Sequence, residues 1–162
     1  MNCNLFKNLT LGIDPKLLTS LQIKRYFSKT NKIKVISKNL IDEISKKKDK
    51  LSKPFFSIST EIVGENFKSK LKKIRNYLKK NKSDWIFVSA PENVAWLLNI
   101  RGYDIPNSPI PNCHLLMNDR TIYLITKRKK QNNLVKEKKI KSHQIIEHKN
   151  FENLIDRIKG EK

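Results

Sequence analysis

The sequence contains three histidines and two cysteines, the residue types that most readily indicate a metal site or an activated nucleophile. The segment "HQIIEH" places His143 and His148 around a glutamate, in a pattern close to the H-x-x-E-H motif of zinc proteases. Metal-binding histidines that share a helix face are four residues apart, whereas these are five apart in a segment that looks extended. The sequence therefore favours surface histidines near a short strand over 142–148, and we predict no metal ligand.

Cys113 and His114 are the other candidate pair, as a thiol nucleophile and its base. Both lie in a predicted strand, where neighbouring side chains point to opposite faces, so they cannot pair in this way. A buried cysteine is the better interpretation. The four glycines are dispersed and form no phosphate-binding loop. We therefore predict no catalytic residue in this chain.

Arg101 stands out within the stretch "SAPENVAWLLNIRGYDIPNSPIPN", because it follows the most apolar run of the sequence and precedes a loop with three prolines. Two interpretations stay open. A cation beside Gly102 at a helix C-terminus complements the helix dipole. Alternatively, Arg101 and the loop 103–112 form one wall of a binding cleft, because prolines stiffen a loop as recognition requires.

Hydrophobic periodicity predicts the elements that would position this arginine. An apolar stripe repeats at helical spacing over residues 66–80, with its lysines on the other faces. Residues 84–90 form a compact apolar strand, and Ser89 with Glu92 fits a capping box for the helix that follows. In that helix we expect Trp96 to be buried. Two strands joined by a short turn (113–117, 121–126), an exposed basic stretch (127–141) and a last amphipathic helix (151–158) complete the pattern.

Upstream of residue 59 the pattern is weaker. We expect a helix over 17–28 with Thr19 or Ser20 as its N-cap, a strand at 33–36 and a helical turn at 39–44. The lysine run that ends at Pro54 is typical of a solvated linker. We therefore place a domain boundary there.

The formal net charge of +20 is the strongest compositional signal. Only six of the 35 basic residues are arginine, the residue that recognises bases and phosphates through paired hydrogen bonds. Lysine, asparagine and isoleucine are all abundant. Their codons are rich in A and T, so a coding bias toward A and T would produce this composition. The alternative is that the charge serves nonspecific electrostatic adhesion to nucleic acid or to an acidic surface. The sequence has no apolar run long enough to span a membrane, and its N-terminus does not resemble a signal peptide. Its two cysteines are isolated, as in proteins of a reducing compartment. We therefore predict a cytoplasmic protein without a membrane segment.

The stretch around Arg101 resembles a motif of the Xaa-Pro aminopeptidases (aminopeptidase P) in their three-domain form. The family pattern is close to "aWLlNiRG-D---tP" and is followed by a β-hairpin. It lies in a non-catalytic domain of the creatinase/prolidase N-terminal type. The matching residues are Ala95, Trp96, Leu97, Leu98, Asn99, Arg101, Gly102, Asp104 and Pro109. Weaker matches at 11–19, 35–44 and 61–80 follow in the family's order, although Ser45 replaces the usual tryptophan.

The resemblance implies an α/β fold with a mixed β-sheet flanked by helices, incomplete at both ends. It implies that residues 1–45 are the tail of a first creatinase-N-like domain and 46–58 a lysine-rich linker. Residues 59–162 would be a second such domain, truncated at its C-terminal side. Asn99, Arg101 and Asp104 are the candidates for cleft-facing residues.

Family members cleave the bond between an N-terminal residue and a following proline. They use two divalent metals, usually manganese, in a C-terminal domain that would begin beyond Lys162. The resemblance therefore implies a non-catalytic portion of a cytosolic enzyme, which shapes substrate access and dimerisation and is inactive alone. Its partners would be a catalytic domain, a second copy and, in a complete enzyme, proline-containing peptides. A peptide- or protein-binding module without catalysis, or nonspecific binding of nucleic acid, are the alternatives.

Overall fold

The computed structural model describes residues 8–27, 31–45 and 53–160. The chain divides into two compact units, Met1–Asp49 and Lys50–Lys162. Most of the predicted linker, residues 46–52, lies outside the described residues. The assignment of 1–45, 46–58 and 59–162 to parts of two related domains stays a prediction.

The first unit contains a small parallel β-α-β arrangement. Strand β1 (Thr10–Ile13) pairs with β2 (Lys32–Val35), and helix α1 (Ser20–Tyr26) lies between them in the chain. Thr19 caps α1 in a capping box with Gln22, which confirms the predicted helix start. The short helix α2 (Leu40–Ile44) follows, with Asn39 as its N-cap. In the described part of this unit, Ile13 is the one buried hydrophobic residue, so little of its apolar surface is covered within the unit.

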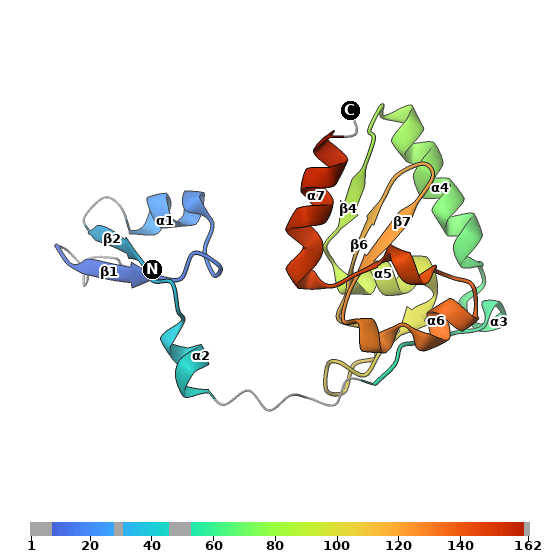
Figure 1. The fold of residues 1–162 in the computed structure, drawn as a ribbon, viewed down its shortest axis with the longest axis horizontal. Helices are drawn as coiled ribbons and strands as arrows, with labels where there is room; N and C mark the ends of the chain where they lie inside the picture. The colour runs from blue at the N-terminus through green and yellow to red at the C-terminus, as the bar shows by residue number, and fades with distance from the viewer. Residues whose placement is uncertain (1–7, 28–30, 46–52, 161–162) are drawn as a thin grey trace. The chain divides into compact units, whose positions relative to one another are not determined.

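The second unit carries the main sheet, which is mixed. Strands β4 (Ile86–Val88), β6 (His114–Met117), β7 (Ile122–Ile125) and β8 (Ile145–Ile146) lie in that order (Figure 1). The first three are antiparallel neighbours, and β8 runs parallel to β7. A separate two-stranded ladder joins β3 (Phe56–Ser57) to β5 (Ile100–Arg101). The predicted hairpin is therefore confirmed, whereas the expected strand over 142–148 is only the two residues of β8 between 3₁₀ turns at Ser142–Gln144 and His148–Asn150.

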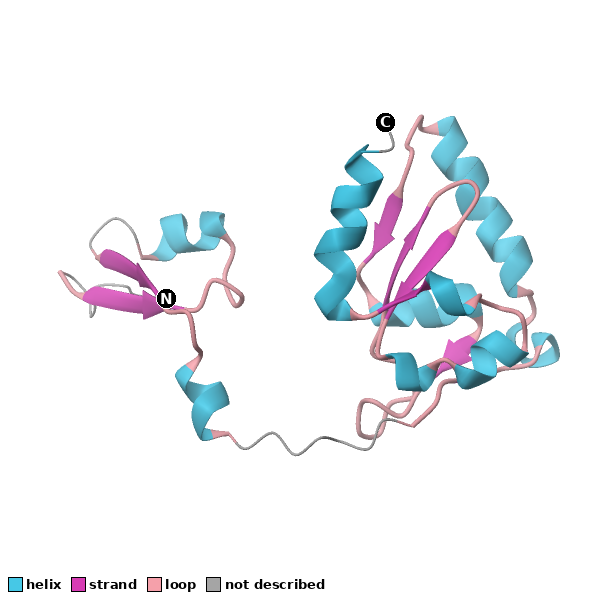
Figure 2. Cartoon of the chain, viewed as in Figure 1, coloured by secondary structure: helices cyan, strands magenta, loops and turns pink. Residues whose placement is uncertain are grey.

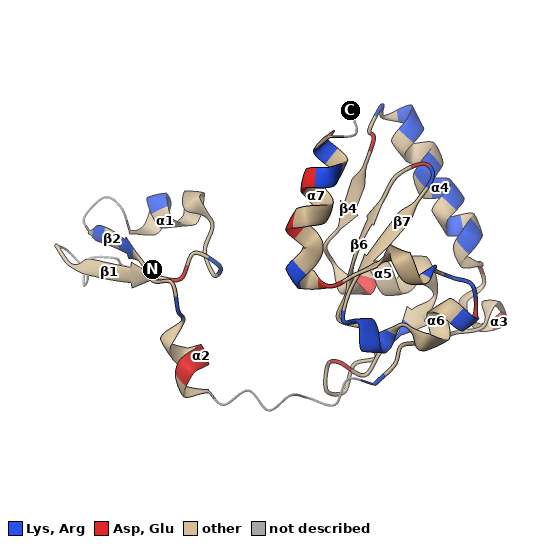
Figure 3. Ribbon diagram, viewed as in Figure 1, with Lys and Arg blue, Asp and Glu red and all other residues tan. Residues whose placement is uncertain are grey.

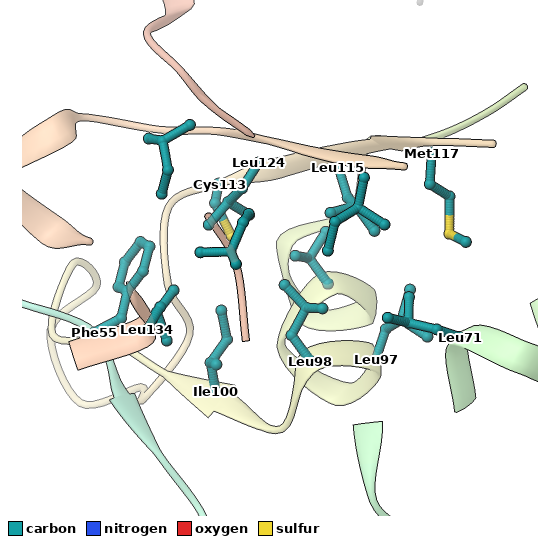
Figure 4. Close-up of a cluster of buried hydrophobic side chains, with 14 residues drawn as sticks. Phe55, Leu71, Leu97, Leu98, Ile100, Cys113, Leu115, Met117, Leu124 and Leu134 are labelled. Atoms are coloured by element: carbon teal, nitrogen blue, oxygen red, sulfur yellow. The ribbon is translucent and has the colours of Figure 1, made fainter. Parts of the chain in front are cut away.

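Helices cover both faces of this sheet (Figure 2). Leu115, Met117 and Leu124 face a core that includes residues of α4 (Phe67–Lys80) and α5 (Pro91–Leu98) (Figure 4). The alternate residues Leu116 and Ile125 face α7 (Phe151–Gly160). This two-residue alternation is the normal consequence of strand geometry. The unit is thus an α/β layered fold, as the sequence predicted.

Helices α4 and α7 begin and end close to their predicted positions, but three local predictions were wrong. Helix α5 has Ala90 rather than Ser89 as its N-cap, and Pro91 occupies the first turn without a side-chain cap. The stretch 127–141 is not wholly exposed, because it forms a 3₁₀ turn (Arg128–Lys130) and α6 (Asn132–Lys136), and it buries Lys130, Leu134 and Ile140. Trp96 is 54% exposed. The remaining helix, α3 (Thr60–Val63), is one turn ending at Gly64 with φ 76°.

Candidate functional site

The corner where α5 meets β5 positions the first of the predicted residues, Asn99. It caps α5 in the left-handed conformation (φ 52°, ψ 49°), which asparagine tolerates better than most residues. Its side chain is buried, with 3% of the residue exposed. Asn99 Oδ1 accepts a hydrogen bond from Lys70 Nζ at 2.7 Å, and its Nδ2 donates to the Glu65 carbonyl at 2.8 Å. Asn99 thus ties the end of α5 to the start of α4.

Lys70, which the apolar stripe of α4 did not mark as buried, is 2% exposed. Its ammonium donates to the Trp96 carbonyl at 2.8 Å and lies 4.2 Å from the centroid of the Trp96 ring. Burial lowers the pKa of Lys70; Glu65 opposes this shift and the nearby Arg101 guanidinium adds to it. The Lys70 ammonium therefore lies over the exposed indole of Trp96, and the Arg101 guanidinium is close enough to affect the charge of Lys70.

Arg101 is half-buried and donates from Nη1 to the carbonyl of Ile100 at 2.8 Å and of Ala95 at 3.5 Å. The second bond satisfies a carbonyl in the last turn of α5, as expected for a cation at a helix C-terminus. Among the described residues, no carboxylate forms an ion pair with this guanidinium. A guanidinium has five N–H donors, so Arg101 keeps capacity to bind a carboxylate or another anion.

Asp104 anchors the proline-rich loop from within. Its Oδ2 accepts a hydrogen bond from the backbone N–H of Asn112 at 2.6 Å, and its Oδ1 pairs with the Lys130 ammonium. The side chains of this pair are 15% and 5% exposed. Across the loop, Gly102 N–H donates to the Pro109 carbonyl at 2.9 Å. These contacts hold both ends of the loop together.

The three predicted residues lie on one short segment, but their side chains contact different neighbours. Asn99 also lines a cavity of about 600 Å³ with residues from α3, α4 and the segment after α6. Arg101 lies near Lys70, and Asp104 bonds to Lys130. Their assignment to a substrate cleft stays a prediction. Sequence reasoning missed Lys70 and Lys130, whose partners are 29 and 26 residues away in the chain.

Cys113 and His114 separate as predicted. Cys113 is fully buried, and burial raises the pKa of its thiol to about 12, so this thiol is a poor nucleophile. The His114 ring lies on the opposite face, with Nδ1 2.7 Å from the Ser89 carbonyl oxygen. His148 lies 5.6 Å from His114 between ring centroids, a proximity that the sequence did not indicate. His143 lies in the 3₁₀ turn Ser142–Gln144.

Among residues 8–27, 31–45 and 53–160, no group of three or more His, Cys, Asp or Glu side chains is placed to hold a metal ion. Manganese prefers oxygen ligands, and Asp104, a half-buried carboxylate of this corner, is already paired with Lys130. The described residues therefore do not fit a di-nuclear manganese centre. No helix in the described part of the chain is long and apolar enough to cross a membrane.

The fold and the α5–β5 corner can be compared with known protein families. A family model described as the creatinase/prolidase N-terminal domain matches residues 46–162, and the chain belongs to this family. This confirms the family that the motif around Arg101 predicted.

Its relatives include several proteins described as probable Xaa-Pro aminopeptidase P. That of Pyricularia oryzae is 34% identical over 108 residues, which are 62% of this chain and 18% of the relative. That of Leptosphaeria maculans is 30% identical over 121 residues, 70% of this chain and 20% of the relative. The chain thus spans about a fifth of the length of these relatives.

A solved structure matches over a larger share of the chain. It is the X-prolyl aminopeptidase of Caenorhabditis elegans, described as a cytosolic enzyme with a di-nuclear active site. The match has a TM-score of 0.71 and 27% sequence identity, and it covers 90% of this chain and 24% of that one. The α/β fold of this chain is therefore that of part of an X-prolyl aminopeptidase.

Proposed function

We propose that this chain supplies the non-catalytic N-terminal part of a cytosolic Xaa-Pro aminopeptidase and is inactive by itself. The observation that carries the proposal is the family match over residues 46–162, in a chain that matches about a fifth of the length of its relatives. Residues 1–45 would be the end of a first domain, 46–58 a linker and 59–162 a second domain. The two divalent metals, usually manganese in this family, would belong to a catalytic domain outside this sequence.

Within such an enzyme, we assign Arg101 the role of a surface contact beside the substrate path. Its unused donors suit a carboxylate of the catalytic domain or of a peptide. Trp96 and Tyr103, at 54% and 62% exposed, supply apolar surface on the same segment. Asn99 and Asp104 position that surface through the contacts described above. Substrate access and dimerisation are the functions we attach to this segment.

The first test assays the purified chain with Mn²⁺ and a peptide whose second residue is proline. We expect no release of the first residue. The second arm replaces the aligned part of the C. elegans X-prolyl aminopeptidase with this chain, and we expect the chimera to cleave the peptide. Cleavage by the chain alone would refute its non-catalytic role. A chimera that elutes as a folded protein yet lacks activity would refute its role as the N-terminal part.

Nonspecific binding of nucleic acid is a second candidate, favoured by the lysines along α4 (Figure 3). Because such binding releases counterions, its affinity falls steeply with salt and does not depend on base sequence. We expect this behaviour with single-stranded and double-stranded oligonucleotides in a titration from about 50 to 200 mM salt. Binding that is insensitive to salt would exclude this mechanism.

A further inference from the structure

The pair His114 and His148 has no part in the proposed function, and its geometry points to a ligand. His114 begins β6, and His148 begins the 3₁₀ turn that leads into α7. Their ring centroids are 5.6 Å apart with an interplanar angle of 82°. Two residues 34 positions apart in the chain are thus brought together on the α7 face of the sheet.

The hydrogen bond of His114 fixes which ring nitrogen could bind a ligand. A carbonyl oxygen only accepts hydrogen bonds, so Nδ1 of His114 carries the proton that bonds to the Ser89 carbonyl at 2.7 Å. In the neutral ring the lone pair is then on Nε2. Histidines that bind metals almost always donate their other N–H to a backbone carbonyl or a carboxylate, which orients the ring. His114 already has this support.

The spacing of the two rings also suits a shared ion. With metal–nitrogen bonds of about 2.1 Å, an ion lies roughly 3.2 Å from the centroid of each imidazole. Two rings that share it then have centroids roughly 5 to 6 Å apart, at coordination angles near tetrahedral or somewhat wider. The observed 5.6 Å is within this interval. Because His148 is exposed, its ring can rotate to direct a nitrogen toward the ion.

Positively charged side chains lie near the site. Lys130 and Lys127 are close enough to His148 to interact with it electrostatically. The same lysines oppose a bound cation, although Lys130 is paired with Asp104. The Phe87 ring lies 5.8 Å from the His114 ring, between centroids. An ion that forms strong bonds to nitrogen therefore suits the site better than Ca²⁺ or Mg²⁺.

We infer that His114 and His148 form a two-histidine site for a divalent transition metal such as Zn²⁺ or Ni²⁺, with water completing the coordination. Imidazole nitrogen is a preferred ligand of both ions. The site joins the start of β6 to the start of α7. A bound ion would therefore fix α7 against the sheet.

The test is calorimetric titration of the full chain with ZnCl₂ and, separately, NiCl₂. Cys3→Ser is the background for all variants, because the Cys3 thiol could bind zinc independently. We expect one ion per chain, and binding weaker by about tenfold or more in His148→Ala and in His114→Ala. His143→Ala is the matched control, since it removes an exposed histidine that is not part of the pair, and it should bind as the parent does.

Circular dichroism would show whether each variant keeps its fold, because replacing the half-buried His114 could disturb the packing around it. His148 is exposed, so its replacement should leave the fold intact, and His148→Ala is the decisive variant. A second readout is NMR of the imidazole protons, where Zn²⁺ should shift the His114 and His148 signals together and leave His143 unchanged. The inference is overturned if the parent shows no saturable binding, which would make the pair an aromatic contact only. It is also overturned if His148→Ala binds as tightly as the parent.

Discussion

The inner and outer sides of the segment Asn99–Asn112 are built from different contacts. On the inner side, Asn99 and Asp104 are bonded to the buried ammonium groups of Lys70 and Lys130. On the outer side, Arg101 is half-buried and Tyr103 is 62% exposed. The same motif therefore contains residues that maintain its shape and residues that can contact a partner. Substitutions on the two sides should affect different measurements.

Asp104→Ala should have the largest effect, since it removes the counter-ion of a lysine whose side chain is 5% exposed. Breaking a buried ion pair costs about 3 to 5 kcal/mol, because a charge stays buried without a partner. We expect a loss of that size in the free energy of unfolding, measured by urea denaturation with circular dichroism.

Asp119→Ala is the matched control, because its contact with Arg120 at 3.9 Å is solvent-exposed and contributes at most about 1 kcal/mol. The double variant Asp104→Ala with Lys130→Met should regain part of the lost stability, since the unpaired charge is gone. Equal stability of Asp104→Ala and Asp119→Ala would mean that the inner ion pair does not hold the loop.

Asn99→Ala should have the next largest effect. It removes the hydrogen bonds to Lys70 Nζ and to the Glu65 carbonyl, and it places alanine at φ 52°. Together these changes should cost about 2 to 4 kcal/mol of unfolding free energy. Asn107→Ala separates the causes, because Asn107 has φ 59° and is exposed. We expect it to cost about 1 kcal/mol, and equal losses in the two variants would show that the Asn99 side-chain bonds are worth little.

Several helices and strands of the second unit could be predicted from the sequence, because the patterns that indicate them are local. The apolar stripes of α4 and α7 each repeat within one helix, and the hairpin of β6 and β7 is marked by its short turn. The motif around Arg101 also gave the family. These predictions needed no knowledge of which elements pack together.

The inner side could not be predicted, because its partners are distant in the chain. Lys70 and Lys130 stand in lysine-rich stretches and have no local feature that distinguishes them from exposed neighbours. Their burial depends on acceptors supplied by the α5–β5 corner and its loop. Trp96 shows the reverse, since an aromatic residue in an apolar helix is 54% exposed. Amino-acid type alone therefore predicts the wrong degree of burial for each of these residues.

Gly102→Ala should have an intermediate effect on the inner side. A Cβ atom at Gly102 would lie 2.8 Å from the Pro111 Cα and 3.2 Å from Phe55 Cδ1. Because the first contact is with backbone, the loop must shift, and overpacking of this kind costs about 1 to 3 kcal/mol. Gly160→Ala is the control, since nothing lies within 4 Å of its Cβ position and alanine favours a helix. A neutral Gly102→Ala would indicate that the loop is not closely packed there.

Arg101→Gln should have the smallest effect on stability and would separate the two sides of the segment most directly. Glutamine keeps a donor for the carbonyls of Ala95 and Ile100 but removes the charge, so we expect a loss below about 1 kcal/mol. In the chimeric aminopeptidase the same change should raise KM for the proline peptide, because a guanidinium contact to a carboxylate is lost. Arg120→Gln, which alters an exposed arginine next to Asp119, should leave both measurements unchanged. If Arg101→Gln instead lowers stability as much as Asn99→Ala and leaves KM unaltered, Arg101 belongs to the inner side and only caps α5.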